Sequence, residues 1–162
     1  MDSLHKLEDM VEKWLKPLPH LPENWRKWLA ENAWWLTLIG VILSVLVIFM
    51  LLGPILFVTA VTTSVYGVVV AETHAGLYMV AIWVSLALMV VVTIIEAFAV
   101  SPLKALSKKG WDLLFLSLAI GVASSVVSAV LNVSIMSLIS AAISAIIGSY
   151  VLFEVRSHFK KA

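Results

Sequence analysis

Four long apolar stretches, separated by short polar segments, constrain this 162-residue chain more than any other feature. A helix needs roughly 20 consecutive apolar residues to cross a hydrocarbon core about 30 Å thick. Hydrophobic residues make up 62% of the chain, against roughly 45–50% in soluble domains. Transmembrane β-barrel strands alternate apolar and polar residues over about ten positions, and these stretches do not. We therefore predict an all-α integral membrane protein with four transmembrane helices in a compact bundle, preceded by an amphipathic interfacial helix.

The apolar stretches also set the predicted domain limits, which are a cytoplasmic segment at 1–33, a four-span domain at 34–155 and a cytoplasmic tail at 156–162. The predicted spans are about 34–58, 77–100, 111–131 and 134–154.

Prolines lie within or at the ends of the predicted spans. Proline lacks a backbone donor and crowds the preceding turn, so Pro54 predicts a kink or an end in the first span. Apolar residues nevertheless continue to Ala71, and we expect an irregular or tilted continuation there. Pro102 predicts the end of the second span at Ser101.

The N-terminal segment 2–16 is amphipathic, with apolar residues at helical spacing and charges on the other side of the wheel. Such a helix lies in the membrane interface or packs on its own bundle or on a partner helix. This helix ends at the prolines that follow it, Pro17, Pro19 and Pro22. A second short helix is expected at 23–32.

Charge placement predicts the orientation. Five Lys and Arg residues precede the first span, three lie between the second and third, and three follow the fourth. All eleven then fall on one side, so the positive-inside rule places both termini in the cytoplasm of a multi-pass inner-membrane protein. Glu72, His74 and Asn132 fall on the outer side. Interfacial anchoring is the expected role of the six tryptophans near the cytoplasmic face, which are Trp14, Trp25, Trp28, Trp34, Trp35 and Trp111.

The segment 111–153 is predicted to be a transmembrane hairpin with small residues at helical spacing on both arms. Small residues let helix backbones approach closely in lipid, whereas serine rings in an oligomer can also line a path for an ion or solute. The absence of charge among these residues favours packing. The predicted packing seam consists of Ser117, Gly121, Ser125, Ser128, Ser137, Ala141, Ser144 and Gly148.

Ionisable residues near the cytoplasmic ends of the spans form the candidate polar cluster. Glu96 is the only acid well inside an apolar stretch, and a charge in hydrocarbon is costly, so such residues are functional candidates. Paired with Lys104 or Arg156, Glu96 would bind a cation or an anionic lipid head group. The alternative is a snorkelling side chain or a local salt bridge that fixes helix packing. The cluster comprises Glu96, Lys104, Asp112, Glu154 and Arg156.

Other chemistry has little support in the sequence. The chain has no cysteine, which excludes disulfides, thiolate metal sites and a cysteine nucleophile. Glu72 and His74 have metal-ligand spacing but lack a further ligand, so we predict no metal site and no cofactor. The serines have no basic partner within the spans, which argues against an enzyme. Basic residues form no large cluster, so a nucleic-acid partner is not expected.

Two stretches, GWDLLF at 110–115 and GSYVLFEVRSHF at 148–159, follow the proline-punctuated N-terminus. Together these features resemble an uncharacterised family of small four-span bacterial membrane proteins. The resemblance covers nearly the whole chain and implies a four-helix membrane fold, but no activity and no functional residue.

From these features we predict a non-catalytic membrane protein that acts as a scaffold or assembly partner through helix–helix contacts. Its expected partners are the lipid bilayer and either a second copy of the chain or another membrane protein. The alternative is a small channel or transporter formed by a homo-oligomer with serine-rich helices along the path.

Overall fold

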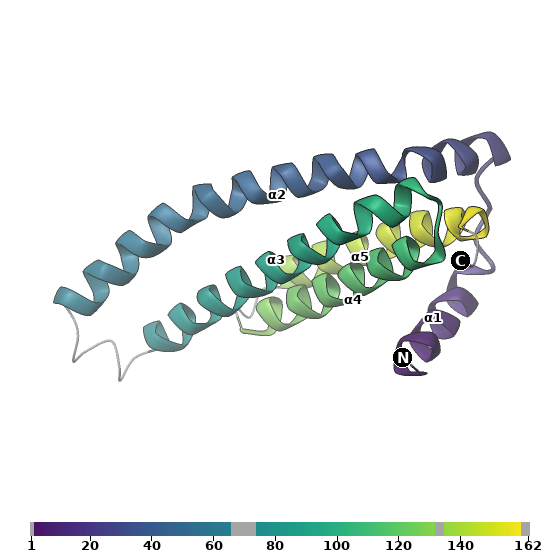
Figure 1. Ribbon diagram of the computed structural model, residues 1–162. Coiled ribbons are helices and arrows are strands. Elements are labelled where there is room, and N and C mark those ends of the chain that lie inside the picture. Colours follow the sequence, from purple (N-terminus) through teal and green to yellow (C-terminus); the bar gives the residue numbers. More distant parts are fainter. Residues whose placement is uncertain (1, 66–73, 132–134, 160–162) are drawn as a thin grey trace.

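The computed structural model describes residues 2–65, 74–131 and 135–159, and these residues are almost entirely helical. The chain order is α1 (Asp2–Leu15), α2 (Glu23–Val65), α3 (His74–Lys104), α4 (Lys108–Leu131) and α5 (Ile135–Val155), followed by a 3₁₀ turn at Arg156–His158 (Figure 1). The predicted all-helical fold class is confirmed for the described residues.

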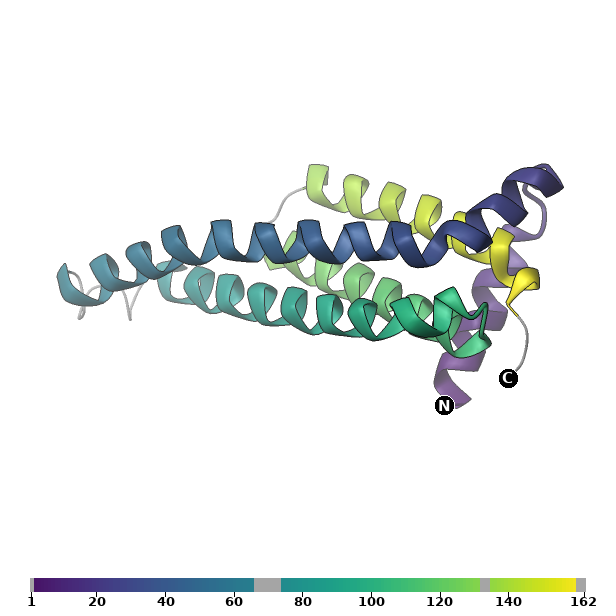
Figure 2. The ribbon, with the colours of Figure 1, turned by 45° about the horizontal axis from the view of Figure 1, so that its top comes forward.

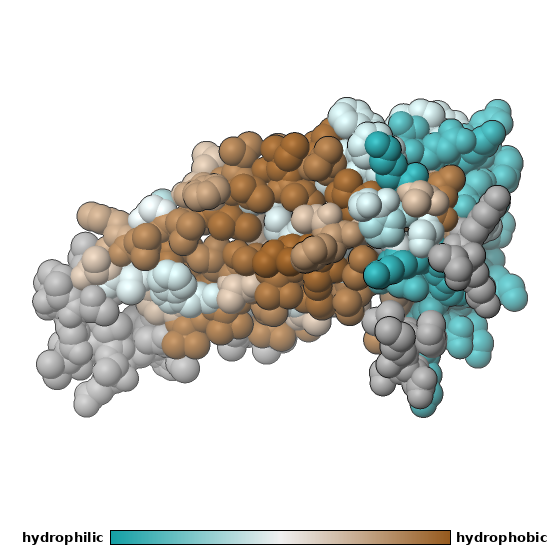
Figure 3. Space-filling model, in the orientation of Figure 1, coloured by the Kyte–Doolittle hydropathy of each residue, from teal (hydrophilic) through white to brown (hydrophobic). Residues whose placement is uncertain are grey.

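Four of these helices are long and apolar enough to cross a membrane. The apolar segments are Glu23–Ala60, Met79–Lys104, Lys108–Ser128 and Leu138–His158. Figure 3 shows an apolar surface over the middle of the bundle and polar residues gathered at one end. This end also carries both chain termini in Figure 1, and we call it the terminal end.

The bundle is held together unequally along its length and around its circumference. Helix α3 packs extensively against both α2 and α4, and α5 packs mainly against α4, whereas α2 and α5 make few contacts (Figure 2). The main hydrophobic core lies at the terminal end and consists of Ala30, Ala99, Leu103, Trp111, Phe115, Leu152, Val155 and Phe159. The bundle is therefore closed at the terminal end, and α2 and α5 are loosely associated elsewhere.

Helix α2 differs from the sequence prediction because it is continuous. The expected short helix at 23–32 and the first span form one helix that starts directly after Pro22, passes through Pro54 and reaches Val65. Pro54 removes one hydrogen bond, but an apolar environment offers the backbone no water, so continuing the helix satisfies the remaining groups. Part of the expected irregular stretch is thus helical, and residues 66–71 lie outside the described part.

The connection from α3 to α4 is also shorter than expected. Helix α3 continues past Pro102 to Lys104, and α4 begins at Lys108 rather than at Trp111. Between them Leu106 has a positive φ of 49°, and the Ser107 amide donates to the Pro102 carbonyl at 3.0 Å. Gly110 sits against this turn, where an added Cβ would lie 2.6 Å from the Leu103 nitrogen. Only glycine permits this close approach of α4 to the end of α3.

Replacing Gly110 with alanine should therefore destabilise the bundle by about 1–3 kcal/mol, since neither backbone can give way without moving a helix. The measurement is the free energy of unfolding of the purified protein in a mild detergent. Gly121→Ala is the matched control on the same helix, because an added Cβ there meets nothing within 4 Å. Alanine is the better helix former, so Gly121→Ala should be neutral or stabilising. Equal effects of the two substitutions would contradict the close approach at Gly110.

Candidate functional site

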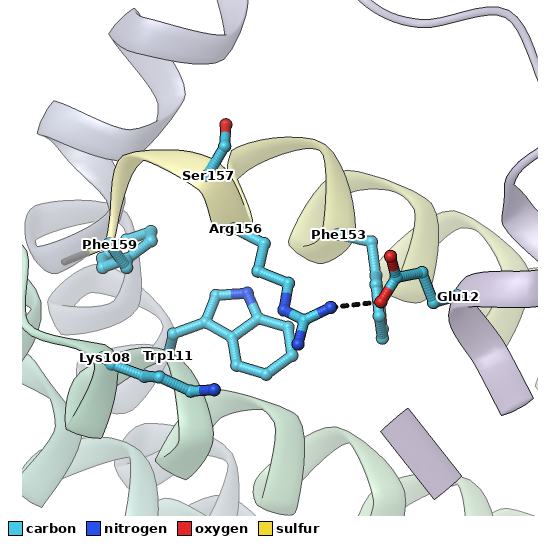
Figure 4. A pocket seen from close by; sticks show the side chains of 7 residues that line it. All are labelled: Glu12, Lys108, Trp111, Phe153, Arg156, Ser157 and Phe159. Carbon is cyan, nitrogen blue, oxygen red and sulfur yellow. Dashed lines mark hydrogen bonds and ion pairs between the residues drawn. The ribbon is translucent and has the colours of Figure 1, made fainter. Parts of the chain in front are cut away.

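The terminal end carries a group of ion pairs centred on Arg156, which begins the 3₁₀ turn directly after α5. Its guanidinium donates to the carboxylates of Glu8 and Glu12, one turn apart on α1. Figure 4 shows the contact with Glu12. Lys108 Nζ lies 3.8 Å from the same Glu8 carboxylate. We call these four residues the Arg156 clasp. The clasp joins α1 to the ends of α4 and α5 and connects segments that are far apart in the chain.

Burial makes the clasp more than a surface ion pair. The Glu8 side chain is only 2% exposed, whereas Arg156 and Lys108 are 31% and 26% exposed. A buried carboxylate needs cations and hydrogen bonds to offset its lost hydration. Arg156 is further held over the aromatic rings of Trp111 and Phe153, with its guanidinium carbon 5.2 Å and 5.8 Å from the ring centres.

The clasp determines which face of α1 points outward. Its acids Glu8 and Glu12 face the bundle, while the apolar residues Leu7, Met10 and Trp14 are exposed. An amphipathic helix at the end of an apolar bundle is well placed to bury such a face in a membrane interface. Of the predicted arrangements, the structure has the one in which α1 packs on its own bundle, and the helix still presents apolar side chains.

A second group of contacts surrounds Glu154, whose side chain is 6% exposed. His20 Nδ1 lies 2.6 Å from one carboxylate oxygen, and the other accepts from the Leu21 amide at 3.1 Å. Arg26 Nε donates to the Glu154 carbonyl at 2.9 Å and lies 3.3 Å from its carboxylate. The Tyr150 hydroxyl donates to the Pro19 carbonyl. The proline-rich connector and the start of α2 are thus attached to the last turn of α5.

A cavity of about 370 Å³ lies beside the clasp, and Figure 4 shows the side chains around it. Its lining includes Lys108 and Arg156, both engaged by α1 carboxylates. The arrangement can attach and orient a helix electrostatically. Within the described residues, no three His, Asp or Glu side chains are grouped so that they could hold a metal ion.

Trp111 is buried, which corrects its predicted role as an interfacial anchor. It is 1% exposed, and its indole N–H donates to the Leu152 carbonyl at 2.8 Å. It stacks on Phe115 and meets Phe153 edge-on, with both ring centres 5.4 Å away. Because α4 begins one turn earlier than predicted, Trp111 lies inside the bundle and not at its rim. The other tryptophans remain compatible with anchoring, since Trp14, Trp25, Trp28 and Trp35 are exposed and Trp34 is half-buried.

The predicted polar cluster is distributed over separate places. Arg156 binds α1, Glu154 binds the connector, and Lys104 lies over the Trp34 ring at 5.1 Å. Asp112 is half-buried on α4. The predicted site residues did not include Glu8, Glu12, Lys108, His20 or Arg26. The sequence did contain one indication of the Arg156 clasp, because Glu8 and Glu12 are one helical turn apart on the polar side of α1.

Glu96 lies apart from these ion pairs, in a cavity of about 430 Å³ that we call the Glu96 groove. The Ser117 hydroxyl of α4 donates to the Leu114 carbonyl at 2.9 Å and lies close to the Glu96 carboxyl group. Side chains of all four apolar helices line the groove, which comprises Leu29, Ala33, Leu36, Thr37, Glu96, Leu114, Ser117, Leu118, Ile147, Gly148, Val151, Leu152 and Val155.

The structure places the predicted packing seam only partly between α4 and α5. Gly148 faces Leu118 across these helices, and Ala141 is half-buried. Ser128 instead faces α3, where its hydroxyl lies 3.3 Å from that of Ser85. Ser125 and Ser144 are exposed, and Ser125 donates to the Gly121 carbonyl. Gly121 is half-buried, and the Ser137 side chain lies outside the described part.

Comparisons with protein-family models, with curated proteins and with solved structures find no match to this chain. The resemblance to four-span bacterial proteins therefore stays a prediction, and any function must be argued from the residues themselves.

Replacing Arg156 with glutamine should release α1 from the bundle, because buried Glu8 loses its closest cation. Breaking a buried pair costs about 3–5 kcal/mol, and we expect about 2 kcal/mol here because Arg156 is partly exposed. Amide hydrogen exchange in α1 should then become roughly 30-fold faster. The control is Lys27→Gln, which removes an exposed pair with Glu31 at 3.9 Å. Unchanged exchange in the Arg156 variant would show that the clasp does not hold α1.

Replacing Trp111 with phenylalanine should keep the ring packing but leave the Leu152 carbonyl without its indole donor. An unsatisfied buried polar group costs about 1–3 kcal/mol, so the free energy of unfolding should fall by that amount. Trp25→Phe, at a tryptophan that is 60% exposed, is the control and should change stability little. Equal losses in the two variants would contradict the role of the Trp111 hydrogen bond.

Proposed function

We propose that this chain is a non-catalytic integral membrane protein that acts as a scaffold or assembly partner through helix–helix contacts. The observation that carries the proposal is the exposure of the outer part of α5. Most of its described side chains between Ile135 and Ile147 are exposed, and those of Met136, Ile143 and Ile147 are more than half exposed. A helix that uses only one narrow face within its own chain has further surface for a partner.

The chemistry of this surface supports a helical partner. Serines 140 and 144 are exposed one turn apart among isoleucines, and Ala142 lies between them. In lipid, apolar burial does not favour protein over lipid contact, so association depends on close packing and hydrogen bonds at small and polar residues. The outer part of α5 offers both beside bulky apolar side chains.

Charge supports a transmembrane orientation with the terminal end in the cytoplasm. The described Lys and Arg residues occur in α1 and directly after it, at the start of α2, around the α3–α4 turn and after α5, all segments of the terminal end (Figures 1 and 3). Such a distribution follows the positive-inside rule for an inner-membrane protein. The exposed face of α1 would then lie in the inner interface.

A second candidate is a channel or transporter built from several copies. The exposed serines of α4 and α5, Ser125 and Ser144, favour it because their hydroxyls could face an aqueous path only inside an oligomer. The described helices of one chain form no closed ring around such a path, so this function requires several copies around an axis.

A photo-crosslinking side chain tests the assembly proposal when it is placed at Ile143 in cells. We expect a discrete adduct whose mass names the partner, either a second copy or another membrane protein. Ser144→Leu in the same chain should reduce the adduct about tenfold if close packing contributes 1.4 kcal/mol. The control position is Phe98 on α3, which is 72% exposed and should contact lipid.

The same cross-linking experiment can reject the proposal. Equal, diffuse labelling at Ile143 and Phe98 would mean that α5 is covered by lipid alone. A single homo-oligomer of four or more copies with nothing else bound, seen by native mass spectrometry, would favour the channel.

A further inference from the structure

The Glu96 groove combines apolar walls with a single acidic group. Glu96 is the only ionisable residue in its lining, and the hydroxyls of Ser117 and Thr37 are its other polar side-chain groups. The remaining lining is aliphatic or glycine. A volume of about 430 Å³ lies within the range that holds one small ligand, and such sites are mostly apolar with a few placed polar groups.

The groove reaches the outer surface between α2 and α5. These two helices make few contacts with each other, and their lining residues Leu36 and Ile147 are 41% and 59% exposed. A molecule dissolved in the surrounding apolar phase could therefore enter sideways between the helices. The core at Ala30 and Val155 closes the groove toward the terminal end.

The cations of the described chain that were candidates for Glu96 are engaged elsewhere. Lys104 lies over the Trp34 ring, and Arg156 binds α1. Among the described ion pairs, none includes Glu96. An acidic side chain at membrane depth usually pairs with a cation or faces a water-filled cavity. The charge complement of this groove is thus a positive group that comes from outside the chain.

Depth decides which kind of positive group fits. Lys104 at the end of α3 lies eight positions after Glu96, about 12 Å along the helix. The head group of a bilayer lipid lies at the interface and does not reach this level. A hydrophobic amine that partitions into the bilayer does.

We propose that the Glu96 groove binds a cationic amphiphile, with its ammonium group on the Glu96 carboxyl group and its apolar body between α2 and α5. The ammonium hydrogens would donate to the Glu96 oxygens, and the Ser117 hydroxyl lies within reach of the same group. This binding goes beyond the assembly function and does not depend on it.

Two probes that differ only in the head group test the site. Dodecylammonium and dodecanol are titrated calorimetrically into phosphatidylcholine nanodiscs that hold the full chain, with empty nanodiscs subtracted. We expect one dodecylammonium per chain, bound at least about tenfold more tightly than dodecanol. Glu96→Gln should reduce dodecylammonium binding to the dodecanol level. Glu31→Gln, at an acid that is 54% exposed on α2, should leave it unchanged.

A third variant and a change of lipid complete the test. Ala33→Leu fills the groove from α2 and should weaken both probes together. Equal binding of the two probes by the unaltered chain would overturn the proposal, and this result does not depend on whether Glu96→Gln folds. Undiminished dodecylammonium binding by a folded Glu96→Gln variant would overturn it as well. Loss of saturable dodecylammonium binding in phosphatidylethanolamine nanodiscs would also overturn it, because the ligand would then be a lipid head group.

Discussion

The hydrogen bond from the Trp111 indole to the Leu152 carbonyl is the contact on which the terminal end depends. It fixes the last turn of α5 against the start of α4 inside the aromatic core. That turn then presents Glu154 to the connector and Arg156 to α1. Because the end of α5 and the turn directly after it carry all three attachments, the N-terminal segment and the start of α2 are positioned by the same few residues.

Close packing at the terminal end contrasts with loose packing further along the bundle. Ala30, Ala99 and Leu103 are almost completely buried, whereas the most apolar 18 consecutive residues of α2 include no buried residue. In water this exposure would be unstable, but in lipid apolar side chains need no protein cover. The loose part leaves the Glu96 groove between α2 and α5 and the outer part of α5 open to other molecules.

Much of the fold was predictable because each apolar helix satisfies its own backbone hydrogen bonds, and this requirement acts locally along the chain. The start of α2 after Pro22 and the four apolar helices follow from it. The prolines were less informative, since Pro54 and Pro102 each interrupt a single hydrogen bond that a long helix can lose. Gly110 carried no evident signal, because its role depends on the Leu103 backbone next to it.

Residue spacing and hydropathy are enough to predict an all-helical chain with four apolar helices and an amphipathic segment. Which side chains meet follows from the packing of these helices in three dimensions. This packing placed Arg156 on Glu8 and Glu12, buried Trp111, and placed Lys104 over the Trp34 ring. The physical reason is that ion pairs and ring contacts depend on the rotation and offset of neighbouring helices. Those are set by steric contacts such as Gly110 against Leu103, which no periodicity records.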